Sequence, residues 1–143
     1  MKGKQVVHAS GGSNEHQTPH FLYRFFDTRY SFNLDAAASD DNHLAPRYFT
    51  KENSALTQSW GKQFRAFVNC PYSGDRIQEK FVSHTLEQLK DNPKSLAIYL
   101  LPVRTETNLW QDLIFPNARA IWYPDERIHY SYAPAGAGFP SAF

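Results

Sequence analysis

The sequence predicts an α/β fold, a sheet with helices packed on its faces, and three observations support this class. The candidate elements follow one another as strand, helix, strand, helix and strand. Residues 95–101 are apolar almost throughout, which is typical of a parallel strand buried on both faces. The length of 143 residues, 41% of them hydrophobic, suits one domain with its own core.

The N-terminal part is expected to be a flexible arm followed by a short helix. Residues 1–15 are rich in glycine, serine and lysine and carry little apolar surface beyond Val6 and Val7. Thr18 and Pro19 mark the start of the helix, because a hydroxyl can cap a helix and proline suits its first position. The apolar side chains that follow at one-face spacing are Phe21, Leu22, Phe25 and Phe26.

Two strands are predicted to deliver polar side chains at their carboxyl ends. Residues 30–34 alternate between apolar and polar and lead to Asp35, and residues 64–69 end at Asn69. The connection between them, residues 40–61, is polar and irregular and has room for one short helix or strand. Ligands of open α/β sheets bind outside the carboxyl ends of the strands, so both ends are candidate sites.

A long helix and a buried strand come next. Ser73 or Asp75 can cap the helix, and the Asp-Asn-Pro sequence at 91–93 stops it. Its apolar stripe consists of Ile77, Phe81, Val82, Leu86 and Leu89. A proline ends the strand at 95–101, and residues 102–105 form a third candidate site at a strand end.

The last part of the chain is predicted to hold a short helix and two strands. Thr105 or Thr107 can cap the helix. Its apolar residues are Leu109, Trp110, Leu113 and Ile114. Residues 118–123 and 128–132 are late strand candidates, and a tail rich in glycine, proline and alanine follows.

Composition and charge exclude several classes of protein. Lysine and arginine outnumber aspartate and glutamate by only 15 to 14, so phosphate binding requires a local patch. The single cysteine, Cys70, excludes an internal disulfide, and the six histidines lack a ligand spacing, so no metal is predicted. The longest apolar run, residues 96–101, is far shorter than the roughly 20 residues of a membrane span. With no apolar stretch in residues 1–8, we expect a cytosolic protein.

Residues 69–72, Asn-Cys-Pro-Tyr, form the most specific segment. A flat ring that bears an amine can stack on Tyr72, while the Asn69 side-chain oxygen and the Cys70 carbonyl accept the two amine hydrogens. Two such acceptors localise the lone pair of the amine nitrogen for attack on an electrophilic methyl group. The alternative is a plain strand-to-helix turn, in which Pro71 fixes the backbone and Tyr72 packs on the core.

The sequence resembles the phage-type DNA N-6-adenine methyltransferases of the Dam family. The resemblance covers about residues 16–143 and rests on five segments that occur in the family's order. These are His-Gln-Thr-Pro at 16–19, Leu-Asp-Ala-Ala-Ala at 34–38, Asn-Cys-Pro-Tyr at 69–72, Leu-Leu-Pro-Val-Arg-Thr-Glu-Thr at 100–107 with Trp110, and Glu-Arg-Ile-His-Tyr at 126–130 with Pro-Ser-Ala at 140–142.

The resemblance implies a Rossmann-like S-adenosylmethionine-dependent methyltransferase core over residues 16–143, which methylates the exocyclic amine of adenine in double-stranded DNA. If the gene belongs to a phage, the enzyme acts in the bacterial host. The residues implied are Thr18, Pro19, Asp35 and Ala36 for the cofactor and Asn69, Cys70, Pro71 and Tyr72 for catalysis. From the residues alone, Asp35 either pairs with the ammonium or hydroxyl groups of the cofactor or caps a turn.

The resemblance also implies substrate contacts at Arg104, Thr105 and Arg127. Arginine suits phosphates and base edges, although each arginine has a surface ion pair as its alternative. The target adenine has to be flipped out of the duplex to reach the motif. Trp60 and Trp110 either line that pocket or belong to the core. The oligomeric state is left open.

Four positions depart from the family's pattern. Cys70 replaces a proline, and this change keeps the backbone carbonyl but loses the fixed backbone angle of proline. Glu126 replaces a glycine, and His16 replaces a tryptophan. The chain also ends at Phe143, where members usually continue, so we expect a compact core shortened at its last strand. The alternative that follows from these departures is a derived protein that binds DNA or cofactor without turnover. A further alternative is an enzyme for RNA or a protein amide, because an Asn-Pro-Tyr type of pocket accepts several planar amines. A cysteine nucleophile is disfavoured. The cytosine-5 methyltransferases, which use one, have proline before the cysteine, whereas Cys70 precedes Pro71 here.

Overall fold

A parallel sheet of four strands forms the centre of the computed structural model, which describes residues 16–72, 74–130 and 138–143. The strands are β1 (Leu34–Asp35), β2 (Arg47–Tyr48), β3 (Arg65–Val68) and β4 (Leu96–Tyr99). They lie in the order β2-β1-β3-β4, and each neighbouring pair is parallel. The predicted α/β class is therefore confirmed. The predicted arm at residues 1–15, the predicted cap at Ser73 and residues 131–132 of the last predicted strand lie outside the described residues.

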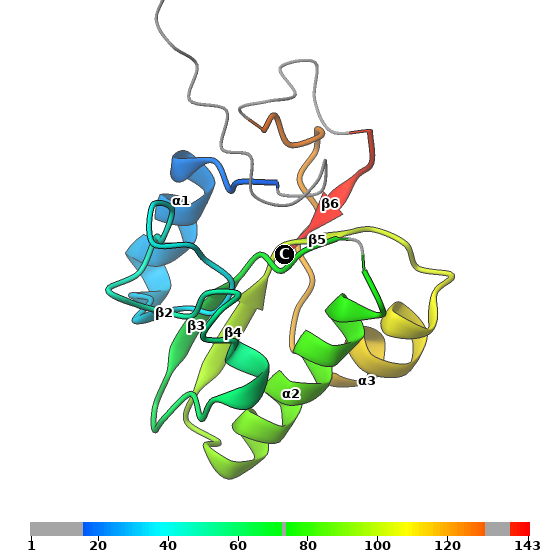
Figure 1. Cartoon of the computed structure of the whole chain (residues 1–143). Helices are drawn as coiled ribbons and strands as arrows, with labels where there is room; N and C mark the ends of the chain where they lie inside the picture. Colours follow the sequence, from blue (N-terminus) through cyan, green and yellow to red (C-terminus); the bar gives the residue numbers. More distant parts are fainter. Residues whose placement is uncertain (1–15, 73, 131–137) are drawn as a thin grey trace, which may run out of the picture.

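Helices cover both faces of this sheet (Figure 1). They are α1 (His20–Tyr30), η1 (Ala55–Thr57), α2 (Ile77–Asp91), the π-helix η2 (Leu109–Ile114) and the short α3 (Phe115–Asn117). Alternate residues of β3 face the two sides: Ala66 and Val68 pack with α2, whereas Phe67 packs with α1. No helix in the parts of the chain described here is long and apolar enough to cross a membrane.

Helix α1 differs from its prediction in its cap and its buried face. The residue before it is Pro19, and no side chain caps it, so the expected capping role of Thr18 is wrong. The buried side chains are Leu22, Tyr23 and Phe26, while Phe21 and Phe25 are 68% and 64% exposed. The reason is Tyr23, whose ring packs edge-on against Phe67 of β3 at 5.3 Å and turns this face of α1 toward the sheet.

The first strand is also shorter than predicted. Residue Tyr30 still belongs to α1, and Ser31 ends the helix in a left-handed conformation with φ of 50°. The carboxylate of Asp27 accepts a hydrogen bond from the Phe32 backbone nitrogen at 2.7 Å, which closes the turn. The strand therefore begins only at Leu34, although it still delivers Asp35 as expected.

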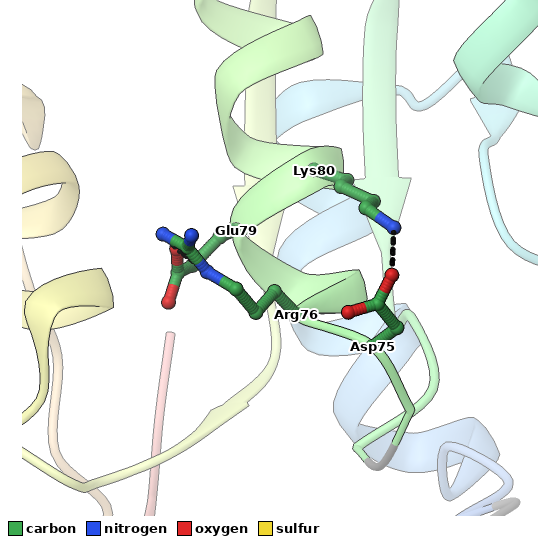
Figure 2. Close-up of polar contacts among 4 residues, drawn as sticks. All are labelled: Asp75, Arg76, Glu79 and Lys80. Atoms are coloured by element: carbon green, nitrogen blue, oxygen red, sulfur yellow. Dashed lines mark hydrogen bonds and ion pairs between the residues drawn. The ribbon is translucent and has the colours of Figure 1, made fainter.

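Helix α2 has the predicted apolar stripe and the predicted end. Phe81 and Val82 are buried, and the remaining stripe residues pack against the same core. The start of the helix is different, because Arg76 precedes it with φ of 52° and no side chain caps it. Asp75 instead pairs with Lys80 at 2.9 Å, and Arg76 pairs with Glu79 (Figure 2).

The strand predicted at 95–101 is divided between two strands, β4 and β5 (Leu101–Pro102). Residues of β4 are only half-buried, because β4 is an edge strand in the described sheet. The chain then continues into β5, so Pro102 lies in a strand that it was expected to end. Strand β5 pairs in antiparallel fashion with β6 (Ser141–Ala142), which gives the Pro-Ser-Ala segment a structural role.

The part after β5 departs furthest from its predictions. The predicted short helix is present as the π-helix η2, but neither Thr105 nor Thr107 caps it. The Thr107 hydroxyl donates instead to the Arg104 carbonyl at 2.7 Å. Residues 118–123 and the described residues 128–130 form no strand, although the backbones of Trp122 and Phe143 exchange two hydrogen bonds.

Candidate active site

A cavity of about 530 Å³ lies at the carboxyl ends of β1 and β3. This is the place where the sequence predicts ligand binding, and two of the three predicted strand ends contribute to it. Its lining comes from five segments: 16–18, 35–44, 50–54, 67–71 and 74–81. The third predicted strand end, residues 102–105, does not line the cavity.

The side chain of Asn69 is held by the segment that precedes α1. Its amide nitrogen Nδ2 donates to the backbone carbonyl of His16 and to the hydroxyl oxygen Oγ1 of Thr18, the second at 2.9 Å. A carbonyl oxygen can only accept a hydrogen bond, so the amide nitrogen must face His16. The acceptor atom Oδ1 is consequently the end of the amide that remains for a ligand in the cavity.

Asp35 lies in the cavity wall but is 4% exposed. Its two carboxylate oxygens accept hydrogen bonds from the backbone nitrogens of Ala37 and Leu44, at 3.3 and 3.0 Å. Burial raises the pKa of this carboxyl, and the two backbone donors and His43 offset part of that effect. Asp35 therefore caps the turn between β1 and β2, the second of the two roles the sequence allows, while its contact with the cofactor stays a prediction.

Cys70 lines the cavity and is 1% exposed. Burial without a compensating positive charge raises the pKa of its thiol to about 12. The thiolate is the nucleophilic form of cysteine, and it is scarce at neutral pH under these conditions. The geometry thus agrees with the sequence in disfavouring a cysteine nucleophile.

We expect Cys70 to resist thiol reagents in the folded chain. With a pKa of about 12, its thiolate fraction at pH 8 is on the order of a thousandfold lower than that of a free cysteine of pKa about 8.5. Absorbance with a chromogenic disulfide reagent should therefore rise slowly in buffer and quickly in guanidinium chloride. Equal rates in the two solutions would contradict the buried placement of this thiol.

Tyr72 lies beside the cavity in a group of aromatic rings. Its ring meets the His16 ring edge-on at 4.7 Å and the Phe139 ring at 5.5 Å, and its hydroxyl lies 3.1 Å from that of Tyr130. The cavity lining contains Asn69, Cys70 and Pro71 but not Tyr72. The stacking role of Tyr72 stays a prediction.

The remaining predicted site residues lie at the surface, in the core, or at the cavity. Arg104, Thr105 and Arg127 are exposed and lie outside the cavity lining. Trp60 and Trp110 are fully buried in the core and do not line the cavity. Thr18 and Ala36 line the cavity, while Pro19 sits next to it as the residue before α1.

Several lining residues were missed from the sequence. Lys51 follows β2, and Lys80 lies in the first turns of α2, where it pairs with Asp75 at the surface. An isolated lysine carries no motif, so only the fold brings these two side chains to one cavity. No cluster of three or more histidine, cysteine, aspartate or glutamate side chains that could hold a metal ion occurs within residues 16–72, 74–130 and 138–143.

Comparisons with known proteins agree with the resemblance seen in the sequence. The family model described as DNA N-6-adenine-methyltransferase (Dam) matches residues 10–140. A DNA N-6-adenine-methyltransferase of Escherichia phage T1 is 31% identical over 106 residues, which is 73% of this chain and 42% of the relative. The chain thus spans less than half the length of this curated relative. Because the family model matches most of its length, the chain belongs to the DNA N-6-adenine-methyltransferase (Dam) family.

Proposed function

We propose that the chain transfers a methyl group from S-adenosylmethionine to the exocyclic amine of adenine in double-stranded DNA. The observation that carries this proposal is the orientation of Asn69, whose amide nitrogen is engaged by His16 and Thr18 while Oδ1 remains as an acceptor. Membership of the family and the name of the phage relative support the same reaction. The cytosol of a bacterial host is the compartment we propose.

The cavity suits S-adenosylmethionine in size and in chemistry. Its volume of about 530 Å³ lies within the range of about 300–1,000 Å³ typical of small-molecule sites. Ala36 and Phe67 supply apolar wall for a purine ring, and Lys51 and Lys80 supply ammonium groups for a carboxylate. When bound, the cofactor supplies an electrophilic methyl group on a positively charged sulfur.

Catalysis by the chain's own residues consists of preparing the amine nitrogen. The exocyclic amine of adenine is a poor nucleophile, because its lone pair is delocalised into the ring. Asn69 Oδ1 and the Cys70 carbonyl accept its two hydrogens, which localises the lone pair on the nitrogen. Once the new nitrogen–carbon bond has formed, the nitrogen releases a proton to water. Cys70 can replace proline in this motif because the accepting group is the backbone carbonyl.

The DNA has to present its adenine outside the double helix, since the amine is not reachable within the stack. We assign the stacking of the flipped base to Tyr72, which directly follows the cavity-lining residue Pro71 in the sequence. Arg104, Thr105 and Arg127 are exposed side chains that suit contacts with phosphates or base edges. The parallel strand order with a cavity at the carboxyl ends supports a Rossmann-like methyltransferase core over residues 16–143.

Methyl transfer to purified acceptors tests this proposal. The chain is incubated with methyl-labelled S-adenosylmethionine and with a mixed-sequence duplex, an RNA of the same sequence, or a duplex of guanine and cytosine only. We expect label in the mixed duplex and none in the duplex without adenine. Preferred labelling of RNA would contradict the DNA assignment, and cofactor binding by calorimetry without any labelling would show a binding protein instead.

The substitution Cys70→Pro is expected to leave methyl transfer at least as fast as in the wild type. Proline keeps the carbonyl and restores the fixed backbone angle of the family's motif. Initial rates of label incorporation compare the two chains, with thermal unfolding as the control for folding. A loss of activity in a folded Cys70→Pro chain would contradict the view that proline is the better residue here.

A further inference from the structure

The hydroxyl of Thr18 contacts a catalytic side chain rather than a helix. We propose that Thr18 is a positioning residue for methyl transfer: it holds Asn69 through Nδ2, so that Oδ1 is presented to the target amine. The proposal rests on the proposed function and adds a residue whose part in the reaction is to orient Asn69. It replaces the capping role expected from the sequence and differs from a cofactor contact.

The hydrogen bonds of the Asn69 amide determine which way it points. Nδ2 carries two hydrogens and has two acceptors, the carbonyl of His16 and Oγ1 of Thr18 at 2.9 Å. Turning the amide over would bring Oδ1 against the His16 carbonyl, and two acceptors cannot bond each other. Together, the two contacts fix the acceptor end of the amide.

Thr18 is available for this contact because α1 does not use it. The Pro19 carbonyl accepts hydrogen bonds from the backbone nitrogens of Leu22 and Tyr23 at the start of α1, at 3.1 and 3.3 Å. Helix α1 has no side-chain cap, which leaves the Thr18 hydroxyl to the strand end.

The same short segment also touches Tyr72, the aromatic member of the motif. The ring of His16 packs edge-on against Tyr72 at 4.7 Å, while its carbonyl accepts from Asn69. The two hydrogen bonds of Asn69 link it to Thr18 and His16, which are 51 and 53 positions away in the chain. Segment 16–18 therefore holds both the amide and the ring of the predicted catalytic motif.

Kinetics with three threonine variants test the positioning role. Thr18→Val keeps the shape but removes the acceptor, so kcat should fall by up to about tenfold, as expected for one lost hydrogen bond. The KM for S-adenosylmethionine should stay within about twofold, because the contact is to Asn69 and not to the cofactor. Thr18→Ser should recover most of the rate. The matched control is Thr28→Val, which removes an exposed hydroxyl bond within α1 and should leave kcat unchanged.

Two kinetic results would overturn the proposal. If Thr18→Val raises KM for S-adenosylmethionine and leaves kcat unchanged, Thr18 is a cofactor contact. If it changes neither constant, the contact with Asn69 has no part in the reaction.

Nuclear magnetic resonance of the Asn69 side chain gives a readout that does not depend on activity. The signal is assigned by its loss in Asn69→Ala. In the wild type both amide hydrogens should exchange slowly with water, and in Thr18→Val one of them should exchange faster. Unchanged exchange would overturn the proposed contact even if the chain proves active. A wild-type chain with the expected exchange but no methyl transfer would instead contradict the proposed function.

Discussion

Replacing Asn69 with alanine should lower kcat for methyl transfer by about 10²–10³-fold, the usual cost of removing one preorganised polar group from an active site. The substitution removes the acceptor that localises the amine lone pair. It also leaves the acceptors of His16 and Thr18 without their shared donor. Initial rates with labelled cofactor measure the effect, and circular dichroism verifies that the variant is folded.

Asn33→Ala is the matched control for this experiment. The side-chain amide of Asn33 also forms hydrogen bonds with the backbone. Its Oδ1 accepts from the Arg65 nitrogen at 2.8 Å, and its Nδ2 donates to the Gln63 carbonyl at 3.4 Å. These contacts lie at the opposite end of β3 from the cavity, so their loss should affect stability and not kcat. An Asn69→Ala chain that keeps more than about a tenth of the wild-type rate would contradict the proposed role of Asn69.

Replacing Trp60 with alanine should lower the free energy of unfolding by about 3–5 kcal/mol, the range for removing a large buried aromatic side chain. The ring is fully buried, packs edge-on against Phe64 at 5.3 Å, and donates its Nε1 hydrogen to the Ala55 carbonyl at 3.0 Å. The variant would lose this packing and leave that carbonyl without its donor. Urea unfolding measures the loss.

Trp122→Ala provides the comparison, because its ring is 43% exposed and should contribute less to stability. Both variants should keep the KM for S-adenosylmethionine under conditions where they are folded, since neither ring lines the cavity. A Trp60→Ala chain of near wild-type stability and altered KM would show that Trp60 belongs to the ligand pocket after all.

The parts of the fold that could be predicted are those with a local signal. The strand predicted at residues 64–69 is present as β3, and its Ala66 and Phe67 pack in the two separate clusters of the core. The spacing of Phe81 and Val82 marks the buried face of α2, and the Asp-Asn-Pro sequence marks its end. Because the carboxyl ends of parallel strands share one edge, Asp35 and Asn69 could be placed near one cavity.

The parts that failed depend on contacts distant in the chain. The residues next to Thr18 indicate a helix cap, yet its hydroxyl bonds Asn69, 51 positions away. Strand β6 is two residues long, too short for any periodicity, and exists because Ser141 and Ala142 pair with β5. Arg76 adopts a left-handed conformation before α2, which residue type alone does not indicate.

The site itself was predicted in its residue types better than in its geometry. Asn69, Cys70 and Pro71 meet in the cavity as expected, because they follow one another directly at the end of β3. The turn-capping role of Asp35 is visible only from its partners, the backbone donors of Ala37 and Leu44. The sequence of a carboxylate followed by small residues does not distinguish a ligand contact from a turn cap.

The central claim is methylation of adenine in DNA with Asn69 as an acceptor of the amine hydrogens. Its most direct test is nucleoside mass spectrometry of DNA from bacteria that lack adenine methylation of their own and express either the wild-type chain or Asn69→Ala. We predict N6-methyladenine in the DNA of cells with the wild-type chain and close to none with the variant. The absence of N6-methyladenine in cells that contain folded wild-type chain, or equal amounts with both chains, would contradict the account.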